Sequence, residues 1–127
     1  MTALEVFARG VSVDSRVTLK KNYEFRRLYG KGKSAVTPYL VVYCLKNRSE
    51  YRRVGFTVSV KLGKAVVRNR VRRRLREIYR LNESKLKSGV DIVIVARGRS
   101  VGAEYAEIER AFLAACSKLG LLGEEEA

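Results

Sequence analysis

The spacing of apolar positions along the chain predicts six main elements. Apolar residues recur three and four positions apart in three segments, as in amphipathic helices: 18–32, 65–87 and 103–120. Short runs rich in β-branched and aromatic residues indicate three strands: 38–45, 52–60 and 90–96. The order αββαβα is typical of an α+β sandwich, in which helices pack on one small sheet within a single domain.

The three strand segments differ in pattern, and the difference predicts their places in the sheet. Segment 38–45 alternates Tyr39 and Tyr43 on one face with Leu40 and Cys44 on the other, and segment 52–60 also alternates strictly. Only a short polar turn separates these two, so we expect an antiparallel hairpin. Segment 90–96 is an apolar run except for Asp91, which predicts a central strand buried on both faces. We expect Asp91, at the start of this strand, to cap or anchor it.

The first helical segment, 18–32, places Phe25 and Tyr29 on one face because they lie four residues apart. Its start can be capped by Thr18 or Asn22, since both carry a side-chain oxygen that can accept a backbone hydrogen bond. Its end is predicted at two glycines, Gly30 and Gly32. In the last helix, the residues spaced to face a sheet are Ile108, Phe112, Ala115 and Leu119.

The middle helix, 65–87, combines an apolar stripe with dense positive charge. The stripe consists of Val67, Val71, Leu75, Ile78 and Leu81. The opposite arc consists of Arg68, Asn69, Arg72, Arg73, Arg76 and Arg80. Arg70 and Arg74 lie toward the apolar edge, where their aliphatic stems can cover apolar surface. Few acidic residues offset this charge, and guanidinium groups match phosphate geometry, so we interpret the arc as a nucleic-acid contact rather than a solvated face.

Charge along the whole chain supports a polyanionic partner. Lys and Arg number 27 against 13 Asp and Glu, which gives a net charge of +14 over 127 residues. Residues 91–127 carry only four of those bases and seven of the acids, so the positive charge lies in the first 90 residues. Nucleic acid is the usual partner of such a protein, and a membrane surface is the alternative.

Several kinds of chemistry are excluded by composition. Without histidine, the chain has no Ser-His or Cys-His nucleophile arrangement. The acidic residues before the last helix are scattered, the glycines lack the spacing of a phosphate-binding loop, and Cys44 and Cys116 alone make no ordinary zinc site. We therefore expect no hydrolysis by this chain alone. The two cysteines are interpreted as reduced core residues of a cytoplasmic protein.

Aromatic residues beside basic ones suggest how single-stranded nucleic acid could be held. Phe25, Tyr29, Tyr39 and Tyr43 are candidate stacking platforms next to a basic groove. The alternative is that they are ordinary core or half-buried sheet residues. No apolar run is long enough to cross a membrane, and the first residues do not have the pattern of a secretory signal.

The stretch "VGFTVSVKLGKAVVRNRVRRRLREIYR" resembles the bacterial ribonuclease P protein subunit. The family signature is the Arg-Asn-Arg of residues 68–70, followed by further basic residues on the same helix. The first helix, "LKKNYEFRRLYGKGK", and the segment "ARGRSV" after the central strand also fit. The resemblance covers roughly residues 19–119, between an N-terminal tail over 1–18 that we expect to be flexible and an acidic C-terminal tail over 120–127.

The resemblance implies an αβ sandwich with a mixed four-stranded sheet, whose fourth strand would lie near residues 34–37. It also implies a left-handed βαβ crossover through the arginine helix, against the usual right-handed rule. In this family the protein pairs with a large catalytic RNA, and together they remove the 5′ leader of precursor tRNA. The RNA partner holds the Mg²⁺ and performs the hydrolysis. No obligate protein partner, no membrane and a cytoplasmic location are implied.

Two sets of residues carry over from the family. The RNA contacts of the arginine helix are Arg68, Asn69, Arg70, Arg72, Arg73 and Arg76. The leader-binding cleft, between the first helix and the sheet, would contain Phe25, Tyr29, Tyr43 and Lys61. Val60 stands where a lysine is frequent and Lys64 where an asparagine is frequent. We therefore expect a different charge distribution in the cleft and carry over no leader-base preference.

Two other functions compete with this one. A structural or ribosomal RNA-binding protein would need the basic helix but no exposed aromatic groove. A DNA-binding protein would place the arginine helix in the major groove, and it would need a helix less engaged with its own core.

Overall fold

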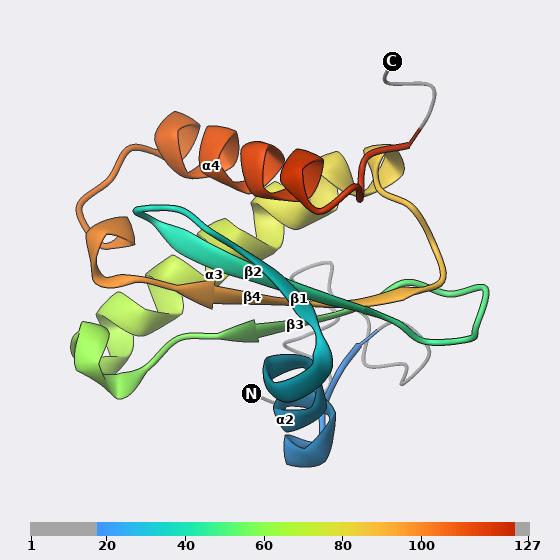
Figure 1. Ribbon diagram of the computed structural model, residues 1–127. Helices are drawn as coiled ribbons and strands as arrows, with labels where there is room; N and C mark the ends of the chain where they lie inside the picture. Colours follow the sequence, from blue (N-terminus) through green and yellow to red (C-terminus); the bar gives the residue numbers. More distant parts are fainter. Residues whose placement is uncertain (1–17, 124–127) are drawn as a thin grey trace.

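The protein is a four-stranded sheet with helices on both faces, and the computed structural model describes residues 18–123. The helices are α2 (Asn22–Lys31), α3 (Ala65–Asn82) and α4 (Tyr105–Lys118). The strands are β1 (Lys33–Val36), β2 (Leu40–Lys46), β3 (Arg53–Thr57) and β4 (Val90–Ala96). Three short 3-10 helices complete the described chain: η1 (Val60–Leu62), η2 (Glu83–Lys85) and η3 (Gly98–Ser100). Figure 1 shows α3 and α4 on one side of the sheet and α2 on the other. The predicted α+β class and the extra strand are confirmed.

The strand order β1-β2-β4-β3 corrects one sequence-based expectation. β2 pairs antiparallel with β1 and β4, whereas β3 pairs only with β4 among these strands, and does so in parallel. The predicted hairpin between β2 and β3 is therefore wrong. The physical reason is that the apolar residues of β4 need to be covered on both faces of the sheet. β4 therefore lies between β2 and β3, in the middle of the sheet. The sheet is mixed, as expected, and the handedness of the β3-α3-β4 crossover stays a prediction.

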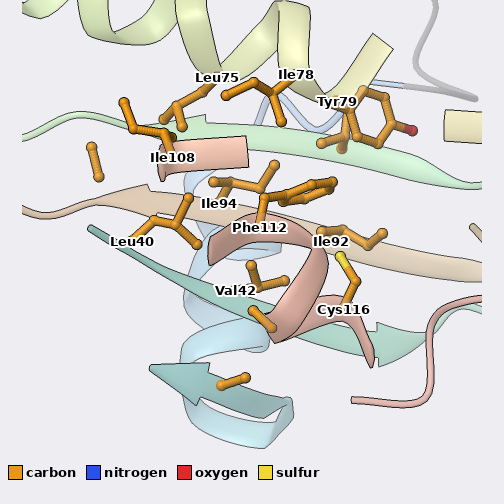
Figure 2. Close-up of a cluster of buried hydrophobic side chains, with 14 of the residues drawn as sticks. Leu40, Val42, Leu75, Ile78, Tyr79, Ile92, Ile94, Ile108, Phe112 and Cys116 are labelled. Atoms are coloured by element: carbon orange, nitrogen blue, oxygen red, sulfur yellow. The ribbon is translucent and has the colours of Figure 1, made fainter. Parts of the chain in front are cut away.

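The main core lies between the sheet and the pair α3 and α4 (Figure 2). The sheet contributes Leu40, Val42, Ile92 and Ile94, and the helices contribute Leu75, Ile78, Ile108 and Phe112. All are essentially inaccessible to solvent, and burial of each such side chain stabilises the fold by roughly 1.5–3 kcal/mol. Cys44 and Cys116 are buried here and unbonded to each other, as expected of core cysteines.

A second, smaller core lies on the other face, under α2. Leu28 of α2 and Leu19 just before it are buried against Val93 of β4. Phe25 and Tyr43 pack at the edge of this cluster and stay partly exposed. The small size of this core leaves part of the sheet face beside α2 open, and the candidate site lies at that boundary.

The ends of the helices differ in detail from the sequence expectations. Neither Thr18 nor Asn22 caps α2; its N-cap is Lys21, and the carboxylate of Glu24 accepts the backbone N–H groups of Lys20 and Lys21 at 3.1 and 3.0 Å. Gly30 lies inside α2, which ends at Lys31 with Gly32 as its C-cap.

The third helix is also shorter than the periodicity suggested. α3 ends at Asn82, and η2 follows it. Leu81, expected in the apolar stripe, is 53% exposed, whereas Tyr79 is buried. The reason is a hydrogen bond from Arg52 to the Tyr79 hydroxyl (2.9 Å), which satisfies the only polar group of that ring. β3 likewise ends at Thr57, short of the expected residue 60.

The chain termini enter the fold further than expected. Residues 1–17 and 124–127 lie outside the described residues, but Thr18 already forms a parallel bridge with Val54 at the edge of β3. Within the expected C-terminal tail, Leu121 is buried and its N–H bonds to the carbonyl of Cys116 at the end of α4. Gly120 takes the left-handed conformation (φ 71°) that this helix ending requires.

An ionic network ties α2 to the sheet. Asp91 of β4 is 3% exposed and accepts two hydrogen bonds from the Arg53 guanidinium of β3, at 2.9 and 2.7 Å. Asn47 donates a third at 2.8 Å. The other side of the same guanidinium contacts Glu24 of α2 at 2.7 Å. One arginine therefore joins β3, β4 and α2, and Asp91 anchors the central strand as its position at the strand start suggested.

Removal of Arg53 should destabilise the fold strongly. Arg53→Met leaves Asp91 buried without its cation, and we expect a loss of about 3 kcal/mol in the free energy of unfolding measured by urea titration. The double variant Arg53→Met/Asp91→Leu should recover part of this loss, because it removes both charges. Arg27→Met, an exposed arginine on α2, serves as the control and should change stability by less than about 0.5 kcal/mol. A loss of equal size in the control would contradict the role of the network.

The same network makes stability depend on pH. Burial alone would raise the pKa of Glu24, but two backbone N–H groups and the Arg53 guanidinium together hold that pKa below its usual 4.5. A carboxyl group with a lowered folded-state pKa stabilises the protein above the unfolded-state value, and this contribution disappears as the pH falls through the folded-state pKa. Unfolding titrations should therefore show stability falling below about pH 4.5, with a shallower fall in Glu24→Gln. Identical slopes would refute this assignment.

Candidate nucleic-acid interface

A shallow open groove of about 480 Å³ runs between α2, the end of β3 and α3. Its lining residues are Asn22, Phe25, Arg26, Tyr29, Phe56, Thr57, Val58 and Arg72. The groove lies at the C-terminal end of β3, which among the four strands of the described residues pairs only with β4. The Thr18–Val54 bridge lies nearer the start of β3, so within residues 18–123 no strand pairs with β3 beside Phe56 and Thr57. It combines aromatic rings with guanidinium groups, the combination that binds single-stranded nucleic acid.

A glycine of β3 fixes the position of the Phe25 ring. A Cβ added to Gly55 would lie 2.6 Å from Cζ of Phe25, so the ring occupies the space that any other side chain would fill. The ring therefore rests directly on the strand, one side in the small core and the other in the groove. The prediction that Phe25 belongs to the cleft agrees with this position.

Tyr29 lies on the same wall, one turn further along α2. Its hydroxyl is 2.7 Å from the Thr57 hydroxyl on β3, and its ring meets Tyr43 edge-on with 5.0 Å between the centroids. Tyr43 is thus beside the groove, behind Tyr29, and does not line it. Tyr39, which the alternation placed with Tyr43, instead donates a hydrogen bond to Glu107 of α4 at 3.0 Å, on the opposite face of the sheet. Its candidacy as a stacking platform in this groove is therefore wrong.

The arginines of α3 divide into three groups. Arg70, Arg73 and Arg80 are exposed. Arg68, Arg72 and Arg76 are half-buried. Arg74 donates a hydrogen bond to the carbonyl of Ala103 at 3.0 Å and so braces the loop before α4. The expectation that Arg74 lies at the apolar edge is confirmed, whereas Arg70, placed with it, is exposed in the first turns of the helix.

Arg72 joins the arginine helix to the groove, because it is the residue of α3 among those that line the groove. Asn69 accepts a hydrogen bond from it at 3.1 Å, which orients the guanidinium. The Arg76 guanidinium lies 6.0 Å from the centre of the Phe56 ring, another lining residue. The predicted arginine surface and the predicted aromatic cleft are therefore adjacent, and they meet along β3.

The link between β3 and α3 carries the remaining predicted residues. Lys61 is exposed on η1 and is not among the residues that line the groove. Val60 on η1 is 73% exposed, and Lys64 is the exposed N-cap of α3. These three lie at the start of the arginine helix rather than between the aromatic rings.

Sequence reasoning missed five lining residues: Asn22, Arg26, Phe56, Thr57 and Val58. Asn22 and Arg26 are one helical turn from Phe25 and Tyr29, so helical spacing could have found them. The residues of β3 were missed because the expected hairpin would have placed β2 along this strand. Only the sheet order shows that β2 does not lie beside β3.

Titratable groups in the described residues offer no obvious catalytic centre. No group of three or more His, Cys, Asp or Glu side chains that could hold a metal lies within residues 18–123. Burial raises the pKa of Cys116 to about 12, so its thiol is a poor nucleophile. Within the same residues, no helix has the length and apolar character needed to span a membrane.

Known proteins share both the sequence and the fold. Residues 13–120 match the family model described as Ribonuclease P. The "Ribonuclease P protein component" of Alkaliphilus oremlandii is 50% identical over 104 residues, which cover 82% of this chain and 91% of that protein. The protein of the same name from Clostridioides difficile is 53% identical over 93 residues, covering 72% and 82%.

Solved structures agree with these matches. The RNase P protein of Staphylococcus aureus superposes with a TM-score of 0.76 at 31% identity, over 84% of this chain and 97% of that one. The protein from Thermotoga maritima gives 0.70 at 32% identity, over 76% and 92%. With a family model that matches most of its length and relatives that align over most of theirs, the chain belongs to the ribonuclease P protein family.

Proposed function

We propose that this chain is the protein component of ribonuclease P, which binds the catalytic RNA and the 5′ leader of precursor tRNA and assists removal of the leader. One observation carries the proposal: an open aromatic groove is joined directly to the arginine face of α3 through Arg72. A structural RNA-binding protein needs the basic helix, but it has no need of a groove suited to a single strand.

The two parts of the surface suit two parts of the RNA. Unpaired bases stack on aromatic rings, each contact contributing roughly 1–3 kcal/mol, so the groove with Phe25 and Tyr29 suits a single-stranded leader. Arg70, Arg73 and Arg80 are exposed and do not line the groove, and their guanidinium groups suit phosphates of a folded RNA. The protein would thereby bring leader and catalytic RNA together and screen their mutual repulsion.

The chemistry belongs to the RNA in this proposal. In this proposal the catalytic RNA would hold the Mg²⁺, which would supply activation of the attacking water. The protein's contribution is affinity and orientation. Its partners are the catalytic RNA and precursor tRNA, without an obligate protein partner or a membrane, and its location is the cytoplasm, where tRNA is processed.

The direct test is cleavage of a precursor tRNA by the cognate catalytic RNA at low Mg²⁺, with and without this protein. We expect a large protein-dependent gain, because phosphate repulsion dominates when little Mg²⁺ is present. Arg70→Gln/Arg73→Gln should lose most of that gain. Lys46→Gln/Lys118→Gln, which removes the same charge at exposed sites outside α3, is the matched control and should keep it.

The two variants separate the outcomes. Equal losses in both would mean that net charge, and not the arginine face, provides the effect. No gain from the unaltered protein, with RNA binding intact, would favour the structural RNA-binding function.

The groove is tested through the leader. Phe25→Ala should weaken binding of precursor tRNA about 5- to 150-fold, because one stacking contact is lost, and leave binding of leaderless mature tRNA unchanged. Tyr23→Ala is the control, since Tyr23 is on the same helix but is 59% exposed and outside the groove. Affinities are measured with the reconstituted complex in both cases, below the melting temperature of each variant. Equal weakening for both tRNAs would exclude the groove as the leader site.

A further inference from the structure

Two hydroxyl groups meet inside the groove, from elements far apart in the chain. The hydroxyls of Tyr29 on α2 and Thr57 on β3 lie 2.7 Å apart, and both residues line the groove. Tyr29 is 39% exposed, so this hydrogen bond faces the open side of the groove rather than the core. Neither sequence spacing nor the family resemblance assigned a role to Thr57.

Counting donors and acceptors shows what the pair can still bind. Each hydroxyl carries one donor and two acceptor positions. The bond between them uses one donor and one acceptor, so the pair retains one O–H donor and several lone pairs. A ligand in the groove therefore meets a donor and an acceptor side by side, which is also the arrangement on the edge of a nucleobase.

The surroundings of the pair complete a seat for one nucleotide. Phe25 of α2 and Arg72 of α3 line the same groove, so an aromatic residue and a cation lie close to the hydroxyl pair. Phe56 also lines the groove, but its ring packs against Tyr79 on the α3 side of β3. The Phe25 ring suits the face of a base, the hydroxyls its polar edge, and the guanidinium its phosphate.

Thr57 also determines where the Tyr29 ring stands. The hydrogen bond holds that ring edge-on against Tyr43, at 68° between the ring planes, and so keeps Tyr43 behind the groove wall. A base in the groove would consequently contact Tyr29 and the hydroxyl pair before it could reach Tyr43.

We infer that the paired hydroxyls of Thr57 and Tyr29 contact the edge of one unpaired leader base, which makes Thr57 a specificity-determining residue of the groove. This inference rests on the proposed function, because it presupposes that the leader enters the groove. It predicts that one leader position, and only one, senses the Thr57 hydroxyl.

The experiment measures affinities of the reconstituted complex for precursor tRNAs that each lack one leader base while keeping the ribose and phosphate. Thr57→Val removes the hydroxyl and keeps the branched shape, which also suits a strand. We expect it to weaken binding of intact precursor about 3- to 10-fold, the effect of one hydrogen bond. That loss should vanish for the substrate that lacks the base at one particular position. Thr57→Ser, which keeps a hydroxyl, should restore affinity, and Tyr29→Phe should reproduce the Thr57→Val pattern.

The outcomes are distinct. A Thr57→Val loss that is the same for every base-deleted substrate, or that is absent with the intact leader, overturns the inference, because the hydroxyl would then act only on local structure or not at all. If the unaltered protein shows no preference for precursor over mature tRNA, the proposed function itself fails. Thermal melts of each variant show whether any general loss comes from unfolding.

Discussion

The position of β4 is the constraint on which the rest of the structure depends. Residues 92–96, the apolar run that follows Asp91, require cover on both faces, so the strand takes the middle of the sheet and holds β2 and β3 apart. β3 thereby becomes the last strand in the sheet order, and the groove lies at its C-terminal end, between α2 and α3. Asp91 at the start of β4 then fixes α2 above that edge through Arg53 and Glu24. The same strand thus provides the centre of both cores and determines where the aromatic wall stands.

The charge of α3 is tolerated because its buried side is firmly held. Val71, Leu75 and Ile78 are almost inaccessible, and the burial of three such side chains outweighs repulsion of a few tenths of a kcal/mol for each arginine pair one turn apart. Some of the arginines also have internal partners: Arg74 braces the loop before α4, and Arg68 donates a hydrogen bond to the carbonyl of Gly63. The exposed remainder has few acidic neighbours, which is understandable if the neighbours are phosphates of another molecule.

The sequence predicted elements better than it predicted their neighbours. Periodicity located the helices and the buried strand, because an element buried on one face or on both has apolar residues at the buried positions. Periodicity did not show that β4 separates β2 from β3. A short polar turn between two alternating segments usually indicates a hairpin, and the central position of β4 depends on the packing of the whole sheet. The same error concealed Thr57 and Phe56 as groove residues. The ends of α2 were misjudged for a similar reason, because Glu24 satisfies the N–H groups that a capping Thr18 or Asn22 was expected to satisfy.

The arginine face of α3 and the aromatic groove lie next to each other, and in the proposed function this arrangement would let the protein orient two RNA segments. Arg72 is a residue of α3 that lines the groove, and the exposed Arg73 follows it on the same helix. In the proposed function, an RNA bound along α3 and a strand bound in the groove would therefore be held at a fixed mutual distance by helices and a strand rather than by loops. Orientation of this kind lowers the entropic cost of bringing two polyanions together, and the cations at the junction reduce their repulsion. In the proposed function both effects would act on a reaction whose catalytic groups lie on the RNA.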